Sequence, residues 1–229
     1  MNQERRTIYN LGVRVVHLES AESTQDECFR LLEEYPEVAV RADVQTRGRG
    51  RHGAMWYSPP GGLWLSVGMR EADPFACAVA GPIAAINAVS PYLPIAPLIR
   101  PPNDVICSGR KLAGILVERR SRGVVTGFGV NLYQETFPPD LNAVSLRQMD
   151  ARGFSLEGIA EALVSGFKEL LGIPIADMIA EYNERLLGLG RVVRVGAVEG
   201  IFRGLSEKGF TVGESIVDPG RFTGLEIIE

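Results

Sequence analysis

The stretch Gln45-Thr-Arg-Gly-Arg-Gly-Arg-His-Gly-Ala-Met-Trp56 decides how the rest of this chain is interpreted. It has no apolar residue before Ala54, so it has nothing to bury in a core. Glycines, which allow positive φ, alternate with arginines along it: Gly48, Gly50 and Gly53 with Arg47, Arg49 and Arg51. Backbone N–H groups and guanidinium groups together suit a polyphosphate or a carboxylate. The stretch therefore predicts an anion-binding loop.

The charge of the whole chain limits what that anion is. The formal net charge is −4, so the positive charge of the loop is local and favours a small anionic ligand over a nucleic-acid groove. Gly48–Gly53 also matches the G-x-G-x-x-G dinucleotide fingerprint, with Glu71 downstream, but that motif needs a helix to begin at the loop. The turn residues 58–62 follow too soon for one. A solvated surface loop is the remaining alternative, and dense arginine–glycine alternation is costly to order without a ligand.

Length and composition set the class of protein. The 229 residues allow one domain with a full core, or one domain with a small appendage. A hydrophobic fraction of 45% is that of a soluble globular protein, and we expect neither a bilayer-spanning run nor a signal peptide. Cys28, Cys77 and Cys107 are odd in number and widely spaced, and only two histidines are present. This pattern predicts reduced thiols in the cytoplasm, without a disulfide scaffold or zinc site.

Apolar periodicity predicts a mixed α/β (α+β) domain over residues 1–188. Strands are expected at 13–18, 38–44, 63–69, 96–100, 105–106, 111–118 and 124–132. The 63–69 strand alternates as a half-buried strand does. Helices are expected from a cap at Ser23 or Thr24 to about 35, over 74–89, from a cap at Ser155, and from Pro174 to 187–190. Pro82 should kink the second helix or start a new one.

The pattern changes after residue 190. Short β-type runs at 192–195, 200–205, 210–212 and 222–227 are separated by glycine turns. They predict a small antiparallel β-barrel over residues 189–229. The expected architecture is therefore a mixed β-sheet catalytic domain flanked by helices, followed by this barrel.

Lys111 and Asp104 are the next candidates for chemistry. Lys111 begins an apolar strand after a hairpin turn, where a lysine is usually solvated, but a cation there also suits a phosphoryl or acyl centre. Asp104, in Pro-Asn-Asp, could orient that lysine or hold Mg²⁺. The alternative interpretation is that it is an ordinary turn residue. Glycines inside a strand, as in Gly127–Asn131, mark either close approach of a ligand or a bulge. Trp56 and Trp64 either wall a pocket or fill core, and for Trp64 we expect core.

Taken in chain order, these stretches resemble the biotin protein ligases. Five segments carry the resemblance over most of the chain: Ser23-Thr24-Gln25, the Gly/Arg loop with the turn 58–63, Arg100–Asp104, Lys111-Leu-Ala-Gly-Ile-Leu116 with Glu118, and Gly127-Phe-Gly-Val-Asn131. The resemblance implies a short family member without a DNA-binding domain. It also implies that biotin and MgATP form biotinyl-5′-AMP, from which biotin passes to a lysine of a biotin carboxyl carrier domain, such as that of acetyl-CoA carboxylase.

The resemblance also implies the site residues. Those for catalysis are Lys111, Arg51 and Asp104, with Asp104 as the candidate Mg²⁺ ligand. Those for biotin are Ser23, Thr24, Gln45, Gly48, Arg49, Arg51, Lys111, Gly127 and Gly129. Those for ATP or the adenylate are Arg49, Arg51, Trp56, Asn103, Lys111 and Asn131. Arg49 and Arg51 are expected to contact the phosphates, and Trp56 to pack on the ligand.

The chain departs from the family pattern at four positions, namely Gln25, Ala54, Arg100 and Pro101. Of these, Ala54, Arg100 and Pro101 are the departures expected to affect ATP and metal binding most. The loop is expected to act as a lid that is ordered only with ligand, which excludes water from the adenylate. We also expect no operator DNA and no membrane partner, and a homodimer through the sheet fits the resemblance.

Two alternative functions remain. A lipoate or octanoate ligase or transferase is one, although its usual Arg-Arg-x-Ser-Gly-Gly-Gly segment is absent. For that class, Cys107 near Lys111 would be a thiolate acyl carrier. A biotin-binding protein with impaired catalysis is the other, motivated by Ala54 and Pro101.

Overall fold

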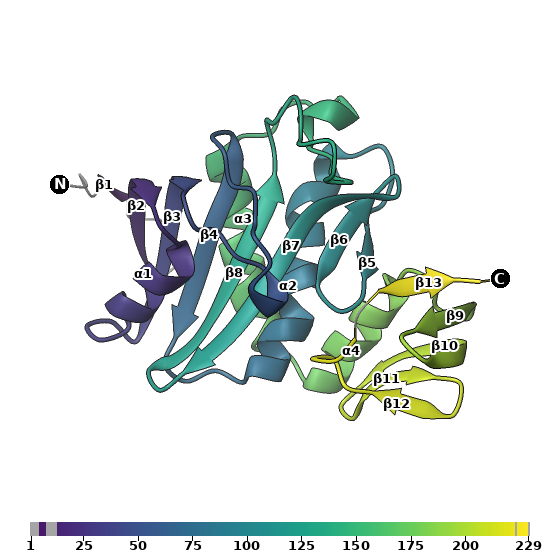
Figure 1. The fold of residues 1–229 in the computed structure, drawn as a ribbon. Helices are drawn as coiled ribbons and strands as arrows, with labels where there is room; N and C mark the ends of the chain where they lie inside the picture. Colours follow the sequence, from purple (N-terminus) through teal and green to yellow (C-terminus); the bar gives the residue numbers. More distant parts are fainter. Residues whose placement is uncertain (1–4, 8–12, 223, 229) are drawn as a thin grey trace.

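The centre of the protein is an eight-stranded sheet with the order β1-β2-β3-β4-β8-β7-β6-β5 (Figure 1). The structure is a computed structural model that describes residues 5–7, 13–222 and 224–228. The strands are β1 Arg5–Thr7, β2 Arg14–Ala21, β3 Glu37–Gln45, β4 Gly62–Met69, β5 Leu98–Arg100, β6 Asp104–Cys107, β7 Arg110–Arg120 and β8 Gly123–Asn131. β2 and β3 run parallel, whereas the other neighbours are antiparallel. This is the mixed sheet that the sequence predicted, with β1 added at one edge.

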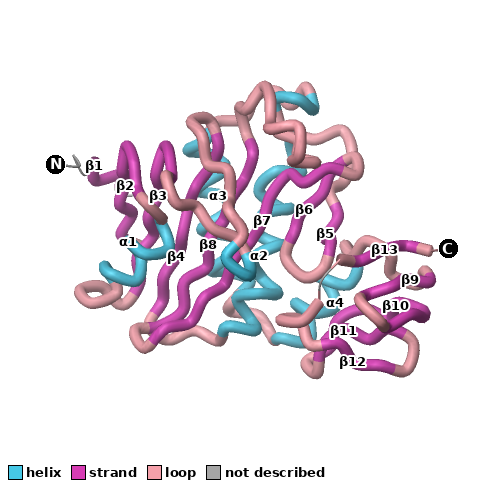
Figure 2. The backbone as a smooth tube through the Cα atoms, in the orientation of Figure 1, coloured by secondary structure: helices cyan, strands magenta, loops and turns pink. Residues whose placement is uncertain are grey.

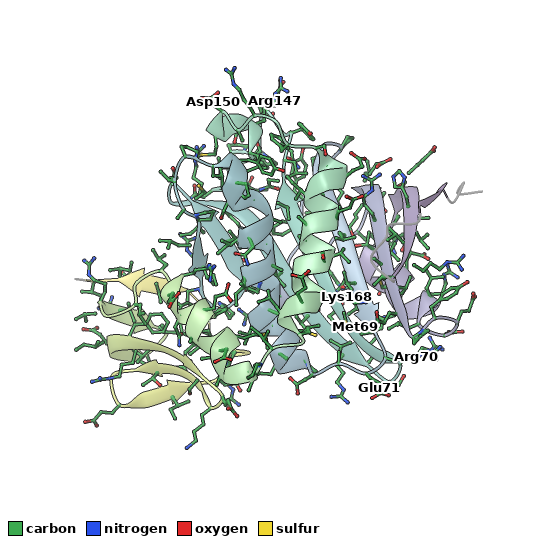
Figure 3. All side chains as sticks on the ribbon, turned by 180° about the vertical axis from the view of Figure 1, so that it is seen from behind. Met69, Arg70, Glu71, Arg147, Asp150 and Lys168 are labelled. Atoms are coloured by element: carbon green, nitrogen blue, oxygen red, sulfur yellow. The ribbon has the colours of Figure 1, made fainter. Side chains whose placement is uncertain are left out.

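Two helices, α2 Pro74–Val89 and α3 Leu156–Leu170, cover the back of the sheet, as the view from behind shows (Figure 3). A third helix, α4 Ile175–Glu184, packs beside α2 and against strand β10 (Val198–Ser206). Asp73 caps α2 by accepting from the Ala76 N–H, and Ser155 caps α3 by accepting from the Gly158 N–H, as predicted for Ser155. Lys168, near the end of α3, pairs with Glu37 of β3 at 2.7 Å and so ties this helix to the sheet.

The prediction of a half-buried strand at residues 63–69 is wrong, because all eight residues of β4 are buried. Its odd-numbered residues, such as Leu63 and Val67, belong to the core under α2 and α3. Its even-numbered residues face the front, where α1 (Thr24–Leu31) packs, so the strand is covered on both sides. The expected alternation was present, but a central strand between two layers has no solvated face.

α2 contradicts one of the two alternatives predicted for Pro82. It continues through Pro82 as one helix, so this proline does not start a new one. With the short 3₁₀ turn that follows, Pro74–Tyr92 is also long and apolar enough to cross a membrane by length and composition, which the sequence analysis did not recognise. Most of this stretch is buried inside the fold, between the sheet and α3, as expected for a core helix.

The front of the sheet is covered differently. α1 packs its buried face on β3 and β4 near the edge of the sheet. Beside it, the connection from β3 to β4 crosses in front of the sheet as a long loop with one short 3₁₀ turn, η1 Arg51–Gly53 (Figure 2). No longer helix begins at this loop, so the dinucleotide-binding alternative is excluded. α1 ends at Leu31, before the expected residue 35, and α4 ends at Glu184, before 187–190.

The C-terminal residues form a separate antiparallel sheet with the order β12-β11-β10-β9-β13, here called the C-terminal β-unit. Its strands are β9 Val192–Val195, β10 Val198–Ser206, β11 Gly209–Val212, β12 Ser215–Val217 and β13 Leu225–Ile227. Phe202, Phe210 and Phe222 are buried and in mutual contact at its centre. The sequence analysis missed β12 and placed the start of β13 at residue 222, which is a core residue of the unit instead.

Candidate active site

The Gly/Arg loop, residues 45–58, is folded against the front of the sheet. The Thr46 N–H donates to Ala21 O and the Arg47 N–H to Glu22 O, which fixes the start of the loop beside β2. Further along, the Trp56 N–H donates to Gly48 O at 2.9 Å, so the loop doubles back on itself. Gly48 is tightly enclosed, since a Cβ there would lie 2.5 Å from Ser58 Oγ. The loop thus has one defined path across the sheet.

A cavity of about 270 Å³ lies between the loop and the sheet. Most of the residues expected to bind substrates line it: Ser23, Thr24, Gln45, Arg49, Arg51, Trp56, Asn103, Asp104, Lys111, Gly127 and Gly129. Gly48 and Asn131 do not. Gly48 shapes the loop behind the cavity, and the Asn131 amide donates to Lys111 O and Val144 O. Segments that are distant in sequence therefore meet at one cavity.

One end of this cavity is a chain of neutral hydrogen-bonding groups. Gln45 Oε1 accepts from the Thr24 N–H at 2.9 Å and from Thr24 Oγ1 at 3.0 Å. Because the Thr24 hydroxyl donates there, Ser66 Oγ, 2.8 Å away, donates to Thr24 Oγ1. Gln45 Nε2 in turn donates to Ser58 Oγ. These contacts fix the orientation of the Gln45 amide at the wall of the cavity.

Arg49 is neutralised by carboxylates on two sides. It pairs with Asp26 of α1 at 2.8 Å and with Glu118 of β7 at 2.6 Å. It also donates to Ser23 Oγ at 2.9 Å. Ser23 is the N-cap residue of α1, one of the two predicted, but its hydroxyl makes no capping hydrogen bond to the helix. Arg120 adds a second cation on Asp26. Burial acts to raise the pKa of Asp26, and the hydrogen bonds and charges of Arg49 and Arg120 bring it below its usual value.

Lys111 lies at the centre of the cavity wall. Its Nζ pairs with Asp104 Oδ1 at 2.7 Å and lies 4.8 Å from the centre of the Trp56 ring. Asn103 holds the turn before Asp104 in place, because its amide donates to Ile115 O and its carbonyl accepts from the Ile115 N–H. The lysine is therefore held between a carboxylate and an aromatic ring, and it is not a free solvated strand end.

Glycines on two strands leave the floor of the cavity without side chains. Gly114 of β7 is paired with Gly129 of β8, and Gly127 follows on the same face of β8. The Trp56 ring lies on Gly114 and Gly129, where an added Cβ would come within 2.8 and 2.4 Å of it. This geometry favours the close-approach interpretation of the Gly-x-Gly strand over a bulge. Trp56 Nε1 is buried without a partner among the described residues, and such a group calls for an acceptor.

Arg51, expected to contact phosphate, also has partners that the sequence did not predict. Its guanidinium donates to three backbone carbonyls of the C-terminal β-unit, those of Pro219, Gly220 and Phe222, at 3.0–3.1 Å. Among the described residues, no carboxylate lies within ion-pair distance of it. Burial lowers its pKa, and the charge of Asp104 acts in the opposite direction. Arg51 is thus a cation without a neutralising partner at the edge of the cavity.

A second cavity of about 170 Å³ adjoins the first and shares Met55, Trp56 and Lys111 with it. Aromatic and aliphatic groups line it, together with acidic and amide side chains: Tyr57, Phe137, Asp140, Leu141, Asn142, Ala143 and Asn131. Asn131, absent from the first cavity, therefore lies in the second. Among the residues that line this cavity, Phe137 and residues 140–143 had no functional role predicted from the sequence.

The described residues contain no cluster of three or more His, Cys, Asp or Glu side chains that could hold a metal ion by themselves. Asp104 is the one carboxylate that lines the first cavity. A single carboxylate fits Mg²⁺ only if substrate phosphates supply further ligands, which is the usual way this ion is bound with ATP.

Comparison with known proteins agrees with this geometry. The family model for the biotin/lipoate A/B protein ligase family matches residues 17–134. A biotin–[acetyl-CoA-carboxylase] ligase of Mycobacterium tuberculosis is 33% identical over 192 residues, covering 75% of this chain and 71% of that protein. The chain belongs to the biotin/lipoate A/B protein ligase family.

Further relatives place the chain among the biotin ligases of this family. The bifunctional ligase/repressor BirA of Bacillus spizizenii is 28% identical over 214 residues, which are 85% of this chain and 66% of that protein. The biotin protein ligase from Aquifex aeolicus, solved in complex with biotin and ATP, superposes with a TM-score of 0.79 at 25% identity. The superposition covers 93% of this chain and 98% of that one, so it includes the C-terminal β-unit.

For this family member, the structure gives roles to residues to which the sequence assigned none. Glu118 and Asp26 neutralise Arg49, and Ser66 orients Thr24. Glu118 belongs to one of the segments that carried the resemblance. An acidic residue in a segment expected to lie near an arginine-rich loop could therefore have been predicted to pair with an arginine. Asp26 and Ser66 had no such signal, because only the folded chain brings them to the loop.

Proposed function

We propose that this chain activates biotin with ATP to give biotinyl-5′-AMP and transfers the biotinyl group to a lysine of a biotin carboxyl carrier protein. The main observation that supports this proposal is that the two cavities meet at Lys111, which lies against the Trp56 ring. A ligase of this kind must bring the carboxylate of one substrate against the α-phosphate of another. Two adjoining cavities with a cation between them suit that task.

In this proposal, biotin occupies the first cavity. Its neutral ureido ring pairs with the oriented groups around Gln45 and Thr24, and it lies beside Gly127 of β8, next to the Trp56 ring that covers Gly129. The carboxylate then points towards Lys111. Adenosine occupies the second cavity, between aromatic and aliphatic groups, with Asn131 and Asp140 as polar partners. This arrangement places the α-phosphate near Lys111.

The residues then act as follows. A carboxylate oxygen of biotin attacks the α-phosphorus, and pyrophosphate leaves with the electron pair of the broken P–O bond. Lys111 offsets the charge that develops there, and Arg51, which has no carboxylate partner, binds the departing phosphates. Asp104 would hold Mg²⁺ bound together with ATP, and that ion would neutralise phosphate charge. In the second step, the carrier lysine amine attacks the acyl carbon and AMP leaves.

Several observations weigh against the alternatives. Cys107 is buried in the core, and burial raises the pKa of its thiol, so a thiolate acyl carrier is disfavoured. Cys28, Cys77 and Cys107 are all free and buried, in keeping with the cytoplasm, where we place the protein. Lys111, Asp104 and the glycine platform are all in place, so the geometry favours a working ligase over a relic that only binds biotin.

The test is pyrophosphate release from MgATP on addition of biotin, followed by biotin transfer to a carrier domain, detected by streptavidin. We expect release that depends on biotin and not on lipoate or octanoate. Release with lipoate or octanoate alone would establish the related lipoate chemistry. Biotin binding without any pyrophosphate release would leave only the binding protein.

A further inference from the structure

The turn between β5 and β6 leads into Asp104, whose carboxylate pairs with Lys111 at 2.7 Å. The first two residues of the turn, Pro101 and Pro102, have no backbone N–H groups, so they donate no hydrogen bond that would tie the turn to the rest of the protein. The position of the turn therefore depends on what its carbonyl groups and the Asn103 side chain contact. A shift of the turn would move the Asp104 carboxylate with it.

Two parts of the chain hold this turn. On β7, the Ile115 N–H donates to Asn103 O at 2.9 Å, and the Asn103 amide donates to Ile115 O. On α4, the Tyr182 hydroxyl donates to Pro102 O at 2.7 Å, across 80 positions of the sequence. Tyr182 thus reaches the carbonyl group that lies just before Asn103 and Asp104, although it lines neither cavity.

The side chain of Tyr182 is fixed by its surroundings. It is fully buried, and its ring centre lies 6.3 Å from that of Phe210 in the C-terminal β-unit. Burial and, to a smaller extent, the charge of Asp104 raise its pKa well above the usual range, against an opposing effect of Arg51. The hydroxyl therefore stays protonated, and a buried donor of this kind needs the acceptor that Pro102 O provides.

The packing of α4 and β5 does not require this hydroxyl. A phenylalanine ring would fill the same space in the core. The residues after α4 hold β5 through the backbone, because the Ile99 N–H donates to Arg185 O at 2.7 Å and the Leu187 N–H donates to Ile99 O at 2.9 Å. The hydrogen bond from Tyr182 therefore acts locally, on the turn.

We propose that Tyr182 is a positioning residue: its hydroxyl fixes the turn between β5 and β6, and the turn sets where the Asp104 carboxylate meets Lys111. Lys111 lies at the junction of the two cavities, so a small shift of its partner displaces the cation from the reacting groups. This consequence for the reaction rests on the proposed function, whereas the hold on the turn does not.

Amide hydrogen exchange in the full chain tests the hold on the turn. Tyr182→Phe removes the hydroxyl and keeps the ring. We expect exchange at the Ile115 N–H, which donates to Asn103 O, to rise by about fivefold to tenfold, as for the loss of one buried hydrogen bond. The Leu187 N–H, which donates to Ile99 O, should keep its protection because β5 stays in the sheet. Unchanged exchange at Ile115 would overturn the proposal.

Tyr133→Phe is the matched control. The Tyr133 hydroxyl also donates to a backbone carbonyl, that of Phe154 at 3.2 Å, but Tyr133 lines neither cavity. This variant should leave both the exchange at Ile115 and the rate of pyrophosphate release at their wild-type values. Equal responses of Tyr133→Phe and Tyr182→Phe would show that the loss of any such hydroxyl has the same effect, which contradicts a specific role for Tyr182.

Biotin-dependent pyrophosphate release tests the consequence at Lys111. Tyr182→Phe should lower kcat by about tenfold and leave the KM for biotin within about twofold, because the groups around Gln45 that orient the ureido ring are not held by this turn. A purely structural role would lower the melting temperature while the folded protein kept its kcat. That result would remove Tyr182 from the positioning of Lys111.

A double-mutant cycle shows whether Tyr182 acts through Asp104. Once Asp104→Ala has removed the carboxylate, adding Tyr182→Phe should lower kcat by less than about twofold, because the group that it positions is already absent. If the two substitutions instead multiply their separate effects on kcat, Tyr182 acts on the reaction by another route, and the proposal is wrong.

The two proposals fail separately. If exchange at Ile115 responds to Tyr182→Phe but the wild type releases no pyrophosphate with biotin, the hold on the turn stands without the assigned reaction. If the wild type releases pyrophosphate with biotin but Tyr182→Phe alters neither exchange nor kcat, the role of Tyr182 is wrong and the ligase assignment stands.

Discussion

The two faces of the large sheet are made from alternate residues of the same strands, yet they differ in what covers them. On the back, Phe128 of β8 meets Phe167 of α3 edge to face, with ring centres 5.3 Å apart. On the front, the neighbours of Phe128 in sequence are Gly127 and Gly129, and the Trp56 ring of the loop lies directly on the backbone of Gly129.

This difference separates stability from binding. Large buried side chains on the back contribute apolar area and close packing, which supply most of the stability of a domain. Bare glycines on the front contribute little packing, but they let a ring, or a ligand, approach the backbone. A change on the back should therefore alter unfolding, and a change on the front should alter activity while leaving unfolding nearly unchanged.

Lys111→Ala should have the largest effect and belongs to the front. Loss of the cation between the two cavities should reduce adenylate formation by at least about 10³-fold, because the charge that develops on the phosphate is then unopposed. The melting temperature should stay within a few degrees of wild type. Lys208→Ala, an exposed lysine of the C-terminal β-unit, is the control, and a fully active Lys111→Ala would remove this residue from the mechanism.

Phe167→Ala tests the back. Deleting this fully buried ring should lower the free energy of unfolding by about 3–5 kcal/mol, measured by urea titration. The folded fraction should keep its kcat at saturating substrate within about twofold. A large loss of kcat without loss of stability would show that the two faces are not independent.

Gly129→Ala should have an intermediate effect, confined to the front. The new Cβ would come within 2.4 Å of Trp56, so the ring must move off the platform. We expect kcat/KM for biotin to fall by about tenfold, as for a small misplacement at a reacting centre. Gly166→Ala on α3, where an added Cβ meets nothing within 4 Å, should leave activity unchanged. Equal activities of the two variants would contradict the platform.

Asp26→Asn should have the smallest effect. The folded-state pKa of Asp26 is lowered, so its ion pairs stabilise the fold above the unfolded pKa and lose that contribution as pH falls through the folded value. Wild type should exceed the variant in stability by at most about 1 kcal/mol near pH 7, because the pairs are partly exposed. The two should converge as the pH falls below the folded-state pKa of Asp26, and a difference that stays constant as the carboxylate is protonated would contradict the assignment.

Local sequence predicted much of the fold and of the site. The helix cap at Ser155 and the glycine turns depend only on residues that are close in sequence, so they could be predicted without the structure. The five segments that carried the family resemblance supplied site predictions for about half of the residues that line the first cavity. The burial of β4 on both faces and the edge strand β1 could not be predicted this way, because they depend on which layers cover each strand.

The sequence by itself therefore determined most of the elements, the family and the kind of ligand, since each depends on residue types at short spacings. Only the tertiary structure decided what each arginine of the opening loop contacts. Arg49 and Arg51 look alike in the sequence, but one meets carboxylates on α1 and β7, and the other meets carbonyls of residues 219–222. The physical reason is that hydrogen bonds between residues up to 171 positions apart exist only once both domains have folded and packed.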